Sequence, residues 1–192
     1  MSRKTLVRLA MAVFAATLLA ACTPATPKFA IKYAEKRGTI TKNGLRFVIV
    51  PDATTQMVEV DVRYDVGSRE DPDGKAGLAH LVEHLMFQQR PDGATTPPLM
   101  HFLDQLTVFF NAFTNWDTTH YMTYSRNDMA DNLLKIEAMR MFFGCQTISE
   151  AEFEREREVV RNEIRWRGGD ARGEMERQIL ASIYPTGHAY AR

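Results

Sequence analysis

The sequence predicts an α+β fold in which an antiparallel sheet has helices packed on one face. Three observations indicate this fold. Some segments alternate apolar and polar residues, as strands do. The apolar stretch at residues 77–87 carries polar side chains at helical spacing, and a capping signal near residue 150 opens a long helix. The 24 basic and 24 acidic residues give a formal net charge of zero, and no basic stripe indicates nucleic-acid binding.

The first 37 residues are expected to lie outside the folded domain. Residues 1–21 combine a positive start with an apolar run that is too short to span a membrane comfortably. The small residues before Cys22 resemble a bacterial lipobox, which implies a lipoprotein signal peptide at 1–21 and lipidation of Cys22. Residues 22–37 would then be the lipidated N-terminus and a tether, anchored stably in a membrane. The alternative is an ordinary secretory signal with an incidental cysteine.

The first half of the domain is expected to be mostly strand. Asn43-Gly44 is a strong hairpin signal, and the valines from Val58 onward alternate with charged residues, as in a strand with one buried face. The expected elements are a hairpin of strands at 39–41 and 45–50, a strand at 58–64 and a loop at 66–74.

The second half is expected to combine a strand pair with helices. Residues 88–98 are rich in Gln, Pro, Gly and Thr and predict a surface loop, and Cys145 is expected to pack near the end of an apolar helix. Ser149 and Glu152 form a capping box. The expected elements are a short helix at 99–106, strands at 108–114 and 118–125, a helix capped by Asn127 or Asp128 and ending at Phe143 with Met129, Leu133, Ile136 and Arg140 on one face, and a long helix from about residue 150.

The stretch Gly77–Phe87 carries two histidines and one glutamate among apolar residues. In a helix, His80, Glu83 and His84 share one face. Two histidines one turn apart can bind a zinc ion, and the carboxylate between them can take a proton from water at the metal. The alternative is a helix with two surface histidines, although burying three such polar groups without a shared partner would be costly.

The long helix that begins near residue 150 offers a further ligand. Glu156, Val159, Val160 and Glu163 fall on one side, because steps of three, four and seven residues return to the same helical face. Most glutamates of 150–158 are explained by an exposed face with ion pairs along the helix. Glu163 differs, because it shares its side with two valines, where a carboxylate needs a cation.

Together these segments resemble the inverted-motif zinc peptidase family that includes pitrilysin, insulin-degrading enzyme and the mitochondrial processing peptidase. Gly67–Glu70 followed by Gly77–Phe87 is similar to the first signature of that family. Residues 111–121 are similar to its next strand pair, and Glu156–Glu163 to its second glutamate helix. The resemblance covers residues 38–192, which are therefore expected to form the N-terminal domain of a zinc peptidase.

The resemblance also implies roles for single residues. His80, His84 and Glu163 would bind one Zn²⁺, and Glu83 would be the general base. Glu156 would orient a ligand or the water from outside the ligand set. The implied function is that of a zinc-dependent endopeptidase acting on peptide bonds of extended or unfolded peptides.

Substrate and cellular location follow from the same resemblance. Asn111 would lie on the strand at the cleft edge, where family members pair with an extended substrate peptide by strand addition. The lipobox implies a lipid-anchored protein of the bacterial cell envelope that faces the periplasm. Thr23 after the lipidated cysteine, in place of aspartate, would direct the protein to the outer membrane in some bacteria.

The C-terminus departs from the family pattern. Family members carry a further half-domain homologous to the first, whereas this sequence ends at Arg192. The sequence is therefore expected to be a fragment, C-terminally truncated, or to need a partner subunit. The competing hypothesis is a non-catalytic or partner-dependent subunit that binds peptide and zinc without independent turnover. The presence of Glu83 argues against it.

Overall fold

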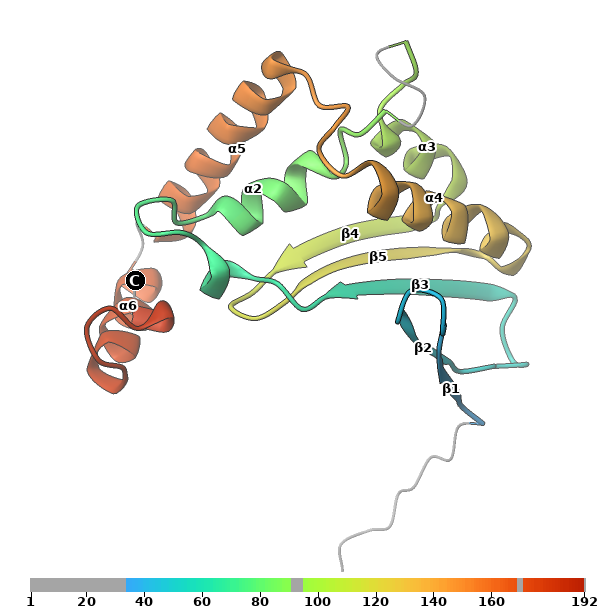
Figure 1. Ribbon diagram of the computed structural model, residues 1–192, viewed down its shortest axis with the longest axis horizontal. Helices are drawn as coiled ribbons and strands as arrows, with labels where there is room; N and C mark the ends of the chain where they lie inside the picture. Colours follow the sequence, from blue (N-terminus) through green and yellow to red (C-terminus); the bar gives the residue numbers. More distant parts are fainter. Residues whose placement is uncertain (1–33, 91–94, 169–170, 192) are drawn as a thin grey trace, which may run out of the picture. The chain divides into compact units, whose positions relative to one another are not determined.

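The computed structural model describes residues 34–90, 95–168 and 171–191 (Figure 1). The expected signal peptide at 1–21, Cys22 and most of the expected tether lie outside these residues. Contacts divide the chain after Ala53 into two units, which are described separately.

The first unit contains an antiparallel hairpin of β1 (Lys36–Thr39) and β2 (Arg46–Ile49). The predicted hairpin is therefore confirmed, but the first strand ends at Thr39 and the predicted strand at 39–41 is wrong. The reason is a longer loop. The side chain of Asn43 accepts a hydrogen bond from the backbone of Leu45 at 3.1 Å, and Gly44 adopts a φ of 75°, so the chain turns over six residues.

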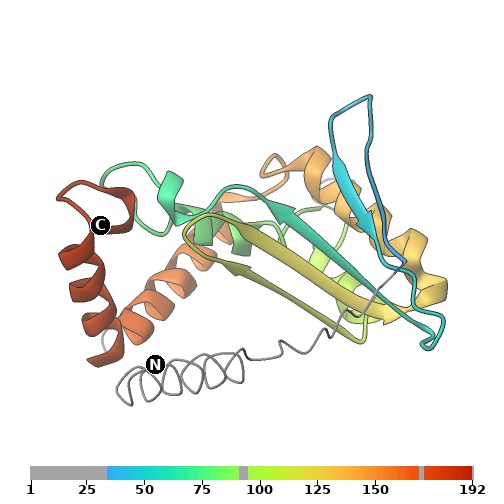
Figure 2. The same cartoon turned by 90° about the horizontal axis from the view of Figure 1, so that it is seen from below.

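The second unit is built on a three-stranded antiparallel sheet of β3 (Met57–Tyr64), β4 (Phe109–Thr114) and β5 (Thr119–Arg126). The strand order is β3-β5-β4, and Figure 2 shows the three strands side by side. Alternate residues of β5, from Thr119 to Ser125, are buried. Helices α2, α3 and α4 lie on one face of this sheet (Figure 1), so the predicted α+β architecture is confirmed.

In the described part of the second unit there are five α-helices: α2 (Leu78–Leu85), α3 (Leu99–Leu106), α4 (Ala130–Phe143), α5 (Glu150–Gly168) and α6 (Ala171–Ile183). The sequence did not predict α6 as a separate helix. The predicted cap of α4 is wrong. A 3₁₀ turn at Asn127–Met129 precedes the helix, Met129 occupies the N-cap position, and the carboxylate of Asp128 binds Arg126. Within the described residues no helix has the length and apolar character needed to cross a membrane.

The predicted capping box at the start of α5 is confirmed. The carboxylate of Glu152 accepts hydrogen bonds from the backbone nitrogen and the hydroxyl of Ser149 at 2.9 and 2.7 Å. Arg90 forms an ion pair with the same carboxylate. This buried glutamate therefore fixes the beginning of α5.

The predicted buried face of α4 is also confirmed. Leu133 and Ile136 are buried, and Ile136 packs with Leu99 and Leu103 of α3 in one apolar cluster. Arg140 continues the same face and is fully buried, where it forms hydrogen bonds with the carboxylate of Glu137 at 3.0 and 3.3 Å.

Two predictions about exposure are wrong, one for Gln88 and Gln89 and one for Cys145. Gln88 and Gln89, which were placed in a surface loop, are buried; the Gln89 amide donates hydrogen bonds to the carbonyl groups of Arg140 and Gly144, and so finds its partners at the end of α4. Cys145 is exposed, because it lies beyond the end of α4. Val159 is 39% exposed, since only Val160 of the two valines packs against α2.

Candidate metal centre and active site

The beginning of α2 is held by a buried carboxylate. Asp71 accepts hydrogen bonds from the backbone nitrogens of Gly77 and Ala79 at 2.7 and 2.8 Å, and the negative charge also suits the helix N-terminus. Gly77 has a φ of 91°, and a Cβ atom there would lie 2.8 Å from the Cδ1 atom of Ile164. Glycine thus allows α2 to start close to α5.

An apolar cluster packs the two helices together. Leu81 and Leu85 of α2 and Val160 of α5 are buried against one another. His84 lies three residues after Leu81, and Glu163 lies three residues after Val160. The packing of the two helices therefore brings the side chains of His84 and Glu163 close together. The geometry of the candidate site therefore follows from ordinary helix packing between segments that are distant in the sequence.

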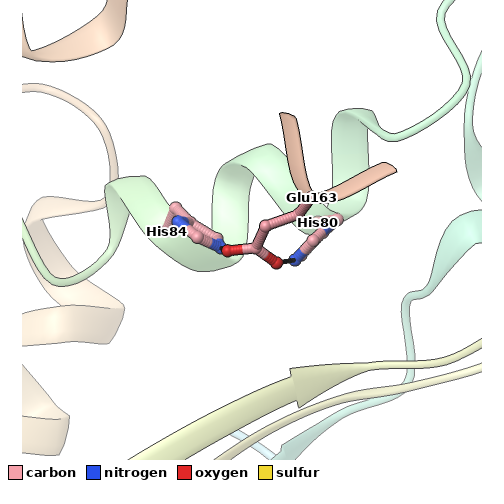
Figure 3. Close-up of side chains that lie close together, drawn as sticks. All are labelled: His80, His84 and Glu163. Carbon is pink, nitrogen blue, oxygen red and sulfur yellow. Dashed lines mark ion pairs between the residues drawn. The ribbon is translucent and has the colours of Figure 1, made fainter. Parts of the chain in front are cut away.

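Both histidines point at one carboxylate, as Figure 3 shows. The Nε2 atom of His80 lies 3.5 Å from Oε2 of Glu163, and the Nε2 atom of His84 lies 3.6 Å from Oε1 of the same residue. The three ligand atoms lie within 4.8 Å of one another. Ligands at 2.0–2.1 Å around a tetrahedral ion are separated by roughly 3.4 Å, so this donor set fits a zinc ion.

The third polar residue of α2 points toward the sheet. Glu83 is only 6% exposed, and its Oε2 atom accepts a hydrogen bond from the hydroxyl of Thr114 on β4 at 2.6 Å. Thr119 on β5 lies 3.2 Å from the Thr114 hydroxyl and donates to the carbonyl of Val66. Sequence reasoning gave Thr114 no role, because only the fold brings it to the carboxylate.

A further carboxylate lies behind His84. The Nδ1 atom of His84 is 3.3 Å from Oε2 of Glu156, which is 7% exposed. A carboxylate only accepts hydrogen bonds, so Nδ1 would donate to Glu156 and leave Nε2 as the nitrogen that could bind a metal ion. The amide of Gln88 donates to the other oxygen of Glu156 at 3.2 Å. Sequence reasoning missed Gln88, because it lies in a stretch rich in turn-forming residues.

A buried tyrosine and a buried arginine lie beneath the site. Burial raises the pKa of the Tyr121 hydroxyl well above its ordinary value, although the nearby cation Arg140 opposes this shift. The guanidinium of Arg140 lies 4.3 Å from the centre of the Tyr121 ring and 5.0 Å from that of Phe87. Tyr121 therefore packs beneath the site as a neutral side chain.

A pocket of about 640 Å³ opens in front of these groups. On one side it is bounded by β4, which is the edge strand of the sheet within the described part of the chain. Asn111 is exposed on this strand and lines the pocket. Other residues that line it include His80, Glu83, His84, Gln88, Thr114, Glu156 and Glu163.

The sequence matches a known protein family over most of its length. The model of the insulinase family, peptidase family M16, matches residues 46–185. The chain belongs to the insulinase family.

Several curated members of the insulinase family are similar to this chain. Zinc protease PqqE of Helicobacter pylori is 38% identical over 141 residues, which are 70% of this chain and 30% of that protein. Probable zinc protease PqqL of Escherichia coli is 30% identical over 68% of this chain and 15% of its own length. Human insulin-degrading enzyme is 28% identical over 67% of this chain and 12% of its own length. The chain thus spans less than a third of each of these relatives.

Solved structures of insulinase-family proteins resemble the structure of this chain. A protease from Helicobacter pylori superposes with a TM-score of 0.71 and 32% identity over 83% of this chain and 38% of that one. The first half of the periplasmic protease PqqL from Escherichia coli gives a TM-score of 0.59 and 28% identity over 77% of this chain and 33% of that one. Pitrilysin superposes with a TM-score of 0.68 and 23% identity over 84% of this chain and 17% of that one, which shows a similar fold.

Proposed function

We propose that the full-length protein is a zinc-dependent endopeptidase that hydrolyses peptide bonds in extended or unfolded peptides of the bacterial cell envelope. The observation that carries this proposal is the meeting of three ligand atoms, from His80, His84 and Glu163, beside the buried carboxylate of Glu83. Membership in the insulinase family and similarity to proteins named zinc proteases support it.

His80, His84 and Glu163 would hold one Zn²⁺. When bound, the ion supplies Lewis-acid chemistry, because it polarises a carbonyl oxygen and lowers the pKa of water. Glu156 would hold the His84 ring from behind through the Nδ1 contact of 3.3 Å. Such a contact outside the ligand set keeps the coordinating nitrogen pointed at the site.

Glu83 would carry the proton during hydrolysis. Its carboxylate takes a proton from the attacking water and returns it to the amine that leaves. The hydrogen bond from Thr114 to Oε2 keeps this carboxylate in one orientation during both transfers. Burial of Glu83 excludes bulk water from the place where the proton moves.

The substrate would bind along β4. An edge strand can add an extended peptide by backbone hydrogen bonding, and Asn111 lies on this strand at the pocket. Recognition through the backbone makes the choice of side chains secondary. A peptide in extended form would therefore be a better substrate than one that is already folded.

The complete enzyme would need a second wall around the peptide, from a homologous half-domain or a partner subunit. Support comes from the short share of each relative that this chain spans and from similarity to a protein named a subunit, mitochondrial-processing peptidase subunit beta of Rattus norvegicus, at 26% identity over 88% of this chain and 32% of its own length. Lipidation at Cys22 would anchor the enzyme in a membrane of the bacterial envelope, either the inner or the outer one. The enzyme would face the periplasm.

The non-catalytic alternative is tested with the same variant as the mechanism. Glu83→Gln in the full-length protein should abolish cleavage of an unfolded peptide while zinc remains bound, because the ligand set is untouched. Glu59→Gln is the matched control, since Glu59 is exposed on β3, and it should cleave at the wild-type rate. Cleavage that survives Glu83→Gln overturns the mechanism, and a wild type that binds zinc without chelator-sensitive turnover favours the non-catalytic subunit.

A further inference from the structure

Two donors, one in the last turn of α2 and one just after the helix, reach the same carboxylate of α5. His84 contacts Oε2 of Glu156 through Nδ1 at 3.3 Å, and Gln88 donates to Oε1 through its amide at 3.2 Å. These two donors are four residues apart, and the helical turn continues past α2, because the backbone nitrogen of Gln88 donates to the carbonyl of Leu85 at 2.9 Å. Side chains at this spacing share one face.

The two contacts together fix the rotation of the carboxylate. A carboxylate held at one oxygen can turn about its terminal bond, whereas one held at both oxygens by neighbouring side chains cannot. Gln88 is 8% exposed, so water competes little with its amide. The orientation of Glu156, and with it that of the His84 ring, is therefore set partly by Gln88.

Arg155 offers a weaker version of the same contact. Its guanidinium lies 3.2 Å from Oε1 of Glu156, but the side chain is 56% exposed. Solvent can replace an exposed donor at little cost, whereas loss of a buried donor leaves a buried carboxylate with fewer partners. Of the two donors to Oε1, Gln88 is the one whose removal matters.

We propose that Gln88 is a positioning residue for the metal centre, acting on His84 through Glu156 to raise the affinity for zinc. The inference rests on the proposed function, because His84 must be a zinc ligand for it to hold. Gln88 does not touch the metal or the substrate in this role. Its contribution is to keep Nε2 of His84 aimed at Glu163, from which it lies 3.6 Å away.

The test is zinc affinity, measured on the metal-free full-length protein by competition with a chromophoric chelator. Gln88→Met keeps the length of the side chain and removes the amide, and we expect the dissociation constant for zinc to rise by about three- to tenfold, the lower end of the range for contacts outside the ligand set. Gln105→Met is the matched control, because Gln105 is exposed on α3, and it should bind zinc like the wild type. Gln88→Asn, which shortens the amide by one methylene, should weaken binding in the same direction.

A double-mutant cycle separates positioning from a general loss of structure. In a Glu156→Leu background, Gln88→Met should change the dissociation constant no further, because its partner is gone. An unchanged constant in the single variants, or an equal loss in the Glu156→Leu background, overturns the inference and leaves the proposed function intact. A wild type that binds no zinc overturns both.

Discussion

The hydroxyl of Thr114 donates a hydrogen bond of 2.6 Å to Oε2 of Glu83, which joins the edge strand of the sheet to the helix that carries both histidines. One face of β4 borders the pocket where a peptide would bind, and Thr114 reaches from this strand to the candidate general base. The position of the base thus depends on the strand that is proposed to receive the substrate.

Removing this hydroxyl should slow the chemical step selectively. For Thr114→Val we expect kcat to fall by about tenfold or more, since small misplacements of a catalytic group are costly, while KM and zinc affinity change little. Thr114→Ser keeps the hydroxyl and should retain most of kcat. Steady-state kinetics on an unfolded peptide measure both, and a Thr114→Val enzyme with wild-type kcat would show that the contact has no catalytic role.

The buried ion pair beneath the site should be costly to break. Arg140 and Glu137 are both buried, and Arg140 also donates to the carbonyl of Met86 just after α2 at 3.0 Å. Arg140→Met leaves the Glu137 carboxylate buried without its cation, so the free energy of unfolding should fall by about 3–5 kcal/mol. Urea denaturation measures this change.

The exposed pair of Arg126 and Asp128 provides the control for that experiment. Arg126→Met should lower the free energy of unfolding by no more than about 1 kcal/mol, because solvent screens surface pairs. If Arg140→Met and Arg126→Met lowered the free energy of unfolding equally, burial of the Arg140–Glu137 pair would not increase the cost of breaking it.

Acid should destabilise the protein, because the carboxylate of Glu152 becomes protonated. Burial raises the pKa of this carboxyl, but hydrogen bonds from Ser149 and the Arg90 cation outweigh burial, and the net pKa is below its ordinary value. A lowered pKa in the folded state stabilises the protein above the unfolded pKa, about 4.3 for glutamate, and this contribution is lost as the pH falls through the folded pKa.

Thermal unfolding between pH 7 and pH 3 tests this assignment. Glu152→Gln should have a lower Tm than the wild type at pH 7, and the gap should narrow below about pH 4.3 as the wild-type carboxyl becomes protonated. Glu158→Gln, at an exposed position of α5, should follow the wild-type curve at every pH. A gap that is constant with pH would rule out Glu152 as the titrating group.

Local patterns predicted most of the elements, because their causes are local. Four features depend on residue spacing or on contacts within a few residues: α2, α3, the pair of strands β4 and β5, and the capping box of Ser149. The polar residues Gln88 and Gln89 were misplaced, since their partners are 68 and 51 residues away in the sequence and no local period reports them.

In the candidate site, too, local patterns predicted some residues, whereas others depend on contacts between segments that are distant in the sequence. Spacing alone groups His80, Glu83 and His84, whereas the approach of Glu163 depends on the packing of Val160 against α2. Helical spacing singled out Glu163 as a carboxylate on a partly apolar face, and the resemblance to a peptidase family implied its role as a zinc ligand. It gave no role to Thr114, whose contact with Glu83 bridges 31 positions of the sequence.

The central claim is that His80, His84 and Glu163 bind one zinc ion together, and zinc binding to the metal-free protein tests it most directly. The wild type should bind one zinc per chain, and Glu163→Gln should bind it about 100-fold more weakly, while Glu158→Gln, at an exposed position of the same helix, binds it like the wild type. Wild-type zinc affinity in Glu163→Gln would contradict the claim.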